Sequence, residues 1–269
     1  MGMIATSTHG SPSDPAVLLI GGSGSSMDWW EPDFCAQLTG RYVIRYDHRD
    51  TGESPSYPPG RPGYTGYDLV TDALAVLDQV GVPAAHVVGI SMGGALAQVL
   101  ALDHPDRVLS LTAISTSAGA GDPDLPGMAR STVAAFEAIP EPDWTDDAAV
   151  VSYLVDLQRV MAAKPFDEAE TREIATVAVG RTKNNESSQK NHHATEGGSG
   201  PWRHRLPELT VPTLILHGDE DPLFPLPHGE ALAREIPGAR LVVLPHTGHE
   251  FPRRNWPLVT REILALTAL

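Results

Sequence analysis

Six short apolar runs are the feature that most constrains how this 269-residue chain can fold. Each run has the length of one strand and is mostly apolar without a regular polar alternation, which is typical of strands buried on both faces of a parallel sheet. The runs are AVLLI (16–20), YVIRYD (42–47), AHVVGI (85–90), LSLTAI (109–114), TLILH (213–217) and RLVVLP (240–245). A shorter run, MIATST at 3–8, leaves room for one more strand.

Stretches with helical periodicity separate these runs. In 68–80 the apolar residues fall on one helical face: Leu69, Val70, Ala73, Leu74, Leu77 and Val80. Residues 229–236 and 257–269 show the same pattern. This alternation predicts an α/β fold with a doubly wound, mostly parallel sheet.

The alternation stops between 118 and 205, where helical patterns at 127–139, 145–163 and 166–182 follow one another. The polar stretch KNNESSQKNHHATEGGSG then fits either a loop or a polar helix ending near Gly197. We therefore predict a core formed by 1–117 and 206–269, with 118–205 inserted as a helical cap.

Composition narrows the partners and the compartment. The net charge of −15 disfavours a nucleic-acid partner, because phosphate binding requires a basic face. No apolar stretch reaches the length of about 20 residues that crosses a membrane, and no secretory signal is visible. The single cysteine, Cys35, fits a reducing compartment. We expect a cytoplasmic protein that acts on a small molecule.

The motif G-x-S-x-G, formed by Gly89, Ser91 and Gly93, lies between an apolar run and a helical stretch. In a strand–turn–helix context this spacing predicts a nucleophile elbow, in which larger side chains at the two glycines would collide with the crossing backbone. The alternative is a serine that only caps the helix. The context favours Ser91 as a nucleophile.

A nucleophilic serine needs a histidine base and a carboxylate that orients it. Asp221 follows the run 213–217 in the turn GDEDPLFP, with Asp219 as its rival and Asp122 as a more distant alternative. His249 lies in the loop after the last run, and His246 is the weaker candidate. The order Ser91, Asp221, His249 is the order that the nucleophile-elbow fold uses.

The same chemistry needs donors for the oxyanion. One donor is expected to be the N–H of Met92, directly after the nucleophile, and the other should come from the glycine-rich loop after 16–20. The pair His192-His193 suggests a metal, but no third ligand stands at a convincing spacing. We therefore expect neither a metal nor an organic cofactor.

Together these residues resemble the α/β-hydrolase superfamily over nearly the whole chain. The loop is similar to that superfamily's HGxPGSSxDW motif, with Ile20 at the usual histidine and Trp29 at the end. This resemblance implies Gly22 as the second oxyanion donor, with Ser23 as the alternative. The stretch YDHRDTGES is similar to the D-x-R-G-x-G-x-S turn and is interpreted as structural; its matching residues are Asp47, Arg49, Gly52 and Ser54.

A closer resemblance is to the aclacinomycin methylesterase group. It rests on VIRYDHRDTGES, AHVVGISMG, ALDHPDRVLSLT, VPTLILHGDEDPLFPLPHG and IPGARL. The resemblance implies a cofactor-free serine esterase acting on the methyl ester of a hydrophobic, polyketide-like compound.

Several alternatives share the same residues. A lactonase, a carbon–carbon bond hydrolase or a cofactor-free perhydrolase would use the same triad, and a ligand receptor with slow turnover would retain it. A dehalogenase or an epoxide hydrolase would instead require aspartate at position 91. The substrate pocket is expected between Trp29, Trp30 and the cap, whose candidate lining residues are Phe136, Trp144, Tyr153, Met161, Phe166 and Trp202.

Overall fold

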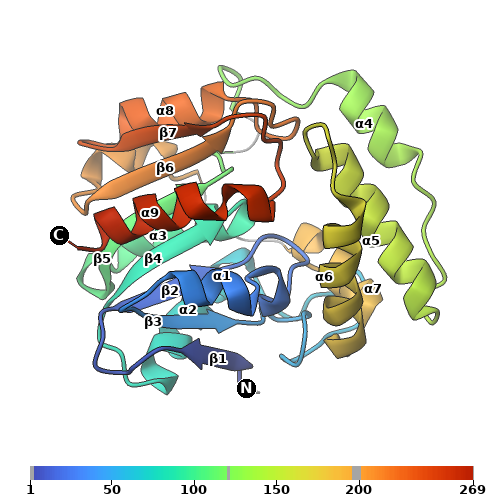
Figure 1. The fold of residues 1–269 in the computed structure, drawn as a ribbon, viewed down its shortest axis with the longest axis horizontal. Coiled ribbons are helices and arrows are strands. Elements are labelled where there is room, and N and C mark those ends of the chain that lie inside the picture. The colour runs from blue at the N-terminus through green and yellow to red at the C-terminus, as the bar shows by residue number, and fades with distance from the viewer. Residues whose placement is uncertain (1–2, 120–121, 196–200, 269) are drawn as a thin grey trace.

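A seven-stranded sheet forms the centre of the fold, in the order β1-β3-β2-β4-β5-β6-β7 (Figure 1). The computed structural model describes residues 3–119, 122–195 and 201–268. The strands are β1 (Thr6–His9), β2 (Ala16–Ile20), β3 (Tyr42–Tyr46), β4 (Ala85–Ile90), β5 (Val108–Ile114), β6 (Thr213–Gly218) and β7 (Arg240–Leu244). β1 pairs antiparallel with β3, and the remaining neighbours pair in parallel. The predicted doubly wound, mostly parallel α/β fold is confirmed.

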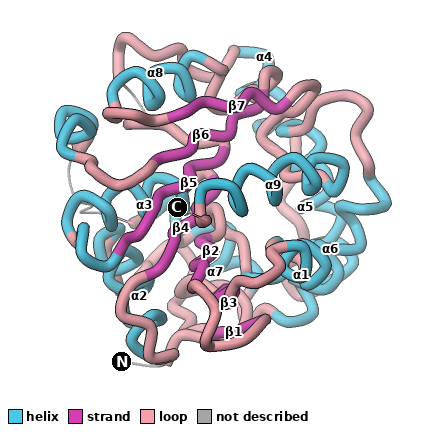
Figure 2. Tube along the Cα trace, turned by 60° about the vertical axis from the view of Figure 1, so that its left-hand side comes forward, coloured by secondary structure: helices cyan, strands magenta, loops and turns pink. Residues whose placement is uncertain are grey.

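Helices cover both faces of this sheet (Figures 1 and 2). One face carries α2 (Gly66–Gln79), α3 (Met92–Asp103) and α8 (Pro227–Glu235), and the other carries α1 (Pro32–Gln37) and α9 (Trp256–Leu266). β2 is buried at every position because its side chains alternate between these layers. Leu18 packs with the α2 and α3 residues, whereas Leu19 packs with those of α1 and α9.

Among the described residues, four α-helices come between β5 and β6, and we name residues 118–205 the cap segment. They are α4 (Arg130–Glu137), α5 (Asp147–Met161), α6 (Glu168–Arg181) and α7 (Asn185–Lys190). They lie together on one side of the molecule, on the right in Figure 1. Side chains of Asp146, Asp167 and Asn184 accept hydrogen bonds from the first turns of α5, α6 and α7, which fixes where these helices begin.

The polar stretch after α6 forms α7 and a short 3₁₀ helix, η3 (His192–Ala194). The predicted end near Gly197 lies outside the described residues. The other 3₁₀ helices are η1 (Met27–Trp29), η2 (Pro105–Arg107), η4 (Arg203–Glu208) and η5 (Arg253–Asn255). No helix in the described ranges is both long and apolar enough to span a membrane.

Polar contacts fasten the end of α6 and the residues after it to the core. The Arg181 guanidinium lies 2.6 Å from the buried carboxylate of Asp47 and 2.9 Å from that of Asp28. The side-chain amide of Asn191 donates to Asp50 at 2.9 Å. α4, in contrast, contains no buried residue. The end of α6 and the residues after it are thus held firmly to the core, whereas α4 buries no side chain.

Candidate active site

A sharp turn between β4 and α3 presents Ser91. Its φ angle is +53°, in a region that residues other than glycine rarely adopt. A Cβ atom on Gly89 would lie 2.2 Å from the Gly93 carbonyl oxygen, and one on Gly93 would lie 2.3 Å from the Ile20 carbonyl oxygen. Both positions therefore accept only glycine, and the collisions predicted from the G-x-S-x-G spacing are confirmed.

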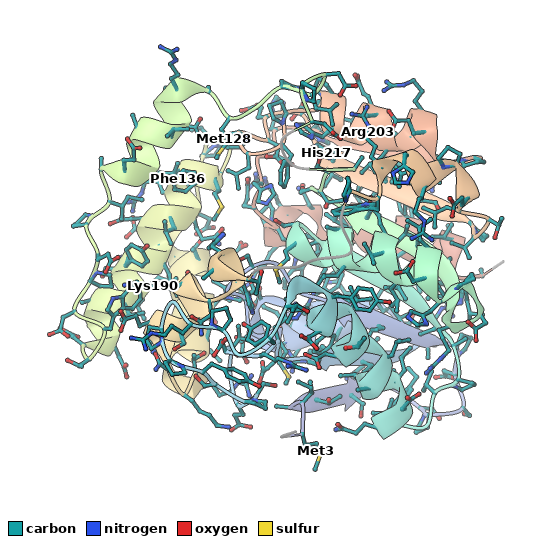
Figure 3. All side chains as sticks on the ribbon, turned by 180° about the vertical axis from the view of Figure 1, so that it is seen from behind. Met3, Met128, Phe136, Lys190, Arg203 and His217 are labelled. Atoms are coloured by element: carbon teal, nitrogen blue, oxygen red, sulfur yellow. The ribbon has the colours of Figure 1, made fainter. Side chains whose placement is uncertain are left out.

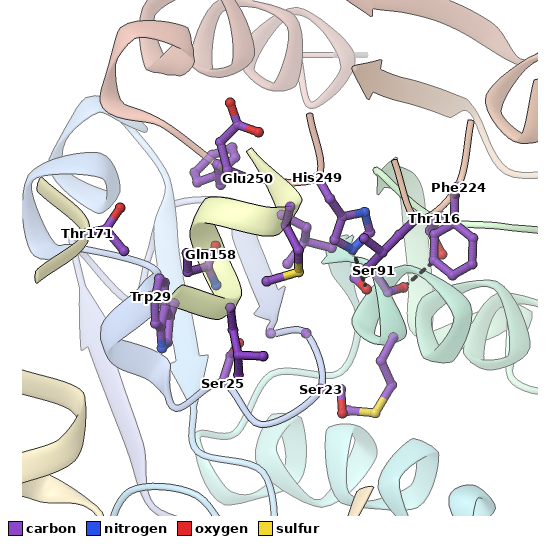
Figure 4. A pocket seen from close by; sticks show the side chains of 18 of the residues that line it. Ser23, Ser25, Trp29, Ser91, Thr116, Gln158, Thr171, Phe224, His249 and Glu250 are labelled. Atoms are coloured by element: carbon purple, nitrogen blue, oxygen red, sulfur yellow. Dashed lines mark hydrogen bonds between the residues drawn. The ribbon is translucent and has the colours of Figure 1, made fainter. Parts of the chain in front are cut away.

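Loops from three strand ends bring Ser91, His249 and Asp221 into one chain of hydrogen bonds, and Figure 4 shows the link between His249 and Ser91. His249 Nε2 lies 2.9 Å from Ser91 Oγ, and His249 Nδ1 lies 2.8 Å from Asp221 Oδ2. Because a carboxylate only accepts hydrogen bonds, His249 Nδ1 donates to it. In the neutral ring, Nε2 then presents its lone pair to the Ser91 hydroxyl, which is the arrangement a general base requires.

Asp221 is held ionised in this chain. Burial raises the pKa of Asp221, but the charge and hydrogen bond of His249 and the backbone N–H of Phe224 outweigh burial, so the pKa lies below its ordinary value. Its Oδ1 atom accepts the N–H groups of Leu223 and Phe224, each at 2.9 Å. Both carboxylate oxygens are therefore engaged, and the orientation of the group is fixed.

The rival residues lie elsewhere. Asp219 is exposed, and its Oδ1 atom accepts the N–H of Thr247. The side chain of His246 is 82% exposed and contacts Glu220. Asp122 forms an ion pair with Arg203. The structure thus brings the first choices together and leaves these alternatives outside the hydrogen-bonded chain.

The expected oxyanion donors lie next to Ser91. A Cβ atom on Gly22 would be 3.5 Å from Cβ of Ser91, and no described residue accepts a hydrogen bond from the Gly22 N–H. Met92 is the first residue of α3, where a backbone N–H has no acceptor within the helix. Ser23, the alternative donor, has its hydroxyl 3.4 Å from His193 Nε2.

A cavity of about 690 Å³ opens above Ser91 and His249. It is bounded by the loop after β2, the loops before and after His249, and the cap segment. Trp29, Trp30, Phe136 and Phe166 line it, as do three more of the candidate residues: Tyr153, Met161 and Trp202. Figure 3 places Phe136 on the cap side of the molecule and His217 on the core side.

Trp144 does not line this cavity, which corrects the sequence-based expectation. Its ring packs edge-on against Tyr153, with 5.5 Å between ring centroids, and the Lys190 ammonium lies 5.5 Å from the centre of the Trp144 ring. These contacts place it in the packing between α5 and its neighbours. The sequence identified an aromatic residue in the cap segment but not which side of the cap its ring faces.

Some contacts at the site have no signal in the sequence. The Thr116 hydroxyl donates to the Ser91 carbonyl oxygen at 2.7 Å (Figure 4). The backbone N–H of His249 donates to the Met161 carbonyl oxygen at 2.8 Å. The Phe224 ring packs against the His249 ring, with 5.5 Å between centroids. Each partner comes from a different element, so only the folded arrangement reveals these contacts.

The turn after β3 has the contacts expected of a structural element. Asp47 is fully buried and accepts the N–H groups of Met27 and Glu53. A Cβ atom on Gly52 would overlap its carboxylate, at 2.2 Å. Arg49 forms two hydrogen bonds with the buried Asp72, at 2.7 and 2.8 Å.

His192 is buried, and protein groups engage both of its ring nitrogens. Nδ1 accepts the Gly24 N–H at 2.9 Å, and Nε2 lies 2.8 Å from the Arg49 carbonyl oxygen. His193 lines the cavity beside Ser23. Among the residues that the structure describes, no group of three or more His, Cys, Asp or Glu side chains is placed to hold a metal ion.

The fold and this strand–turn–serine arrangement define a class. Residues 15–252 match the model of the α/β hydrolase fold family, and the chain belongs to that family. It is 35% identical to rhodomycin D methylesterase DauP of Streptomyces sp. (strain C5), over 90% of this chain and 87% of that protein. With rhodomycin D methylesterase DnrP of Streptomyces peucetius the identity is 34%, with the same coverage.

Solved structures of the same fold agree with the architecture. The esterase EaEST from Exiguobacterium antarcticum superposes with a TM-score of 0.78, at 23% identity, over 100% of this chain and 96% of that one. The enol-lactonase from Burkholderia xenovorans LB400 gives a TM-score of 0.75, also at 23% identity, over 100% and 97%. The predicted resemblance to α/β hydrolases and to methylesterases is confirmed.

Proposed function

We propose that this protein is a serine hydrolase that cleaves a carboxylic ester, with Ser91, His249 and Asp221 as its catalytic triad. The observation that carries the proposal is the continuous hydrogen-bonded chain from Ser91 Oγ through His249 to Asp221 at the floor of the cavity. Membership of a hydrolase family and similarity to two methylesterases support it.

In the proposed reaction, His249 Nε2 takes the hydroxyl proton of Ser91 as the oxygen attacks the ester carbonyl. The electron pair of the carbonyl double bond moves to the carbonyl oxygen, and the N–H groups of Gly22 and Met92 stabilise the resulting oxyanion. The bond from the carbonyl carbon to the alcohol oxygen then breaks as His249 donates its proton to the leaving alcohol, and the acyl group remains on Ser91 Oγ. Water repeats these steps and releases the acid, while Asp221 holds the ring and stabilises its positive charge.

For the substrate, we propose a methyl ester of a hydrophobic, polyketide-like compound. The leaving alcohol of a methyl ester is methanol, which needs almost no room, so the cavity of about 690 Å³ would hold the acyl part of the substrate. Aromatic side chains such as Trp29, Phe136 and Phe166 supply flat apolar walls for it. The sequence similarity to the rhodomycin D methylesterases DauP and DnrP supports a methylesterase activity.

The test is a hydrolysis panel of p-nitrophenyl esters of increasing acyl length, methyl esters of polycyclic acids, and lactones. We expect the wild-type protein to hydrolyse esters with multiple turnover and the Ser91→Ala variant to lose this activity. Preferred cleavage of lactones would favour the lactonase alternative. Tight binding, seen as a raised melting temperature without multiple turnover, would contradict the enzyme assignment and favour a ligand receptor.

A further inference from the structure

His48, in the turn after β3, contacts the loop that carries the proposed oxyanion donor. His48 is fully buried, and its Nε2 atom lies 3.0 Å from the Gly21 carbonyl oxygen. A carbonyl oxygen only accepts hydrogen bonds, so Nε2 carries the proton and donates it. Burial lowers the pKa of His48 to about 4, so the ring is neutral at pH 7 and has this one tautomer.

The carbonyl group of Gly21 and the N–H of Gly22 belong to the same peptide unit. That unit is planar and trans, so its C=O and N–H point in opposite directions. A donor that fixes the Gly21 oxygen on one side therefore fixes where the Gly22 N–H points on the other. Hydrogen bonds linked through one polar group also polarise each other, which makes this N–H a stronger donor.

We propose that His48 is a positioning residue for the oxyanion hole and acts through the Gly21–Gly22 peptide unit. The proposal rests on the proposed function, in which the Gly22 N–H binds the oxyanion. His48 would touch neither the substrate nor Ser91. It would set the direction and strength of a backbone donor that acts most strongly when the carbonyl oxygen becomes negatively charged.

The surroundings of His48 argue against a purely structural role. Its Nδ1 atom is buried and has no hydrogen-bond partner among the described residues. An unpaired buried acceptor is costly, and a phenylalanine would fill the same space without it. Among the residues that the structure describes, the hydrogen bond to Gly21 is the polar contact that accounts for a histidine at this position.

A second buried histidine holds the other side of the same loop. His192, from the cap segment, accepts the N–H of Gly24, and its ring lies 5.5 Å from the ring of His48, edge to face. The Ser25 N–H also donates to the Gly22 carbonyl oxygen, at 3.2 Å. The peptide unit that precedes Gly22 is thus fixed by His48 within a loop that is already rigid on its far side.

The experiment compares His48→Phe, which has no donor, with His48→Gln, whose amide can donate from nearly the same place as Nε2. The probe is an alkyl trifluoromethyl ketone matched to the best ester. Ser91 Oγ adds to its carbonyl carbon, His249 takes the proton, and the ketone oxygen becomes an oxyanion without a leaving group. Its inhibition constant therefore reports on the oxyanion hole, whereas the KM of the ester reports mainly on binding.

We expect His48→Phe to lower kcat about 10-fold and to weaken inhibition by a similar factor, with KM changed less than about 2-fold. His48→Gln should recover most of both losses. Ser54→Ala is the matched control, because Ser54 lies in the same turn and donates to the Asp47 carbonyl oxygen without contacting Gly21. It should lower the melting temperature and leave the ratio of inhibition constant to KM unchanged.

Equal changes in KM and inhibition, or no recovery in His48→Gln, would overturn the proposal. If His48→Phe does not fold, His48→Asn replaces it, because its shorter amide does not reach the Gly21 oxygen. Ester hydrolysis that survives Ser91→Ala would overturn the proposed function and this proposal together. Hydrolysis that requires Ser91 but is unchanged in the folded His48 variants would overturn this proposal alone.

Discussion

The two walls of the cavity are built differently. On the core side, Ser91, Asp221 and His249 lie at strand ends, and Asp221 and His249 are at most 8% exposed. On the cap side, α4 contains no buried residue, and Met128 just before it is 45% exposed although it lines the same cavity. In the core wall, hydrogen bonds of 2.8 and 2.9 Å join the three side chains, and the close backbone packing at Gly89 and Gly93 leaves no room for other residues. In the cap wall, the end of α6 is fastened to the core by Arg181, whereas α4 buries no residue, so the α4 part of this wall is the part that can vary while the chemistry stays the same.

The largest expected effect tests the core wall. Ser91→Ala should lower kcat on any ester by about 10⁴-fold or more, because a triad acts as a unit. Steady-state kinetics measures this change, and a serine-directed phosphonate should label the wild-type protein at one residue, Ser91. Labelling that persists in the alanine variant would show that the nucleophile lies elsewhere.

The orienting carboxylate gives the next largest effect. Asp221→Asn should lower kcat by about 10³–10⁴-fold, because an amide favours the wrong tautomer of His249. Asp219→Asn is the matched control and should have a mild effect, since Asp219 is exposed and its carboxylate accepts the backbone N–H of Thr247 rather than a hydrogen bond from His249. The same kinetic assay serves for both, and the reverse order of severity would make Asp219 the acid.

The difference between the walls also explains what the sequence could predict. Gly89 and Gly93 are required by collisions with nearby backbone, so a spacing pattern is enough to find them. Asp221 and His249 follow buried apolar strands, and the carboxyl ends of parallel strands meet at one edge of a sheet. The positions of Asp221 and His249 after predicted strands were therefore enough to name them as candidates for the triad. The distances between their side chains are known only from the structure.

Other features depend on contacts between distant parts of the chain. Trp144 was wrongly expected in the cavity, because an apolar residue near a helix can face either the cavity or a neighbouring helix. His48 was included in a turn interpreted as structural, and its contact with Gly21 joins residues 27 positions apart. The polar stretch before Gly197 fitted a loop as well as a helix, because the hydrogen bonds of α7 and η3 to the core have no local pattern.

The free energy of unfolding should depend on pH because of two buried histidines, His48 and His192. Burial lowers the pKa of His48 to about 4 and that of His192 to about 3, whereas a histidine in the unfolded chain has a pKa of about 6.5. The unfolded chain therefore binds more protons between these values, and the free energy of unfolding falls as the pH drops from about 6.5 towards 4. Each of the two histidines should make the free energy of unfolding about 2 kcal/mol lower at pH 5 than at pH 8.

Urea denaturation at pH 5, 6, 7 and 8 measures this dependence. His48→Gln removes one of the two groups, so its free energy of unfolding should fall by about 2 kcal/mol less between pH 8 and pH 5. The control is His9→Gln, which also replaces one histidine but at an exposed position at the end of β1. Equal slopes in wild type and His48→Gln would contradict a neutral buried His48.

The smallest expected effect separates the two kinds of cap residue. Phe166 lines the cavity, so Phe166→Ala should change the ratio of kcat/KM for bulky and small esters by about 1–3 kcal/mol, the scale of a few methylenes in an apolar pocket. Trp144 packs on Tyr153 and beneath Lys190, so Trp144→Ala should lower the melting temperature and slow all esters alike. The matched pair needs two measurements, an ester series and a melting curve. A change of ester preference in Trp144→Ala without a loss of stability would place that ring in the substrate's path and contradict the division between wall and packing.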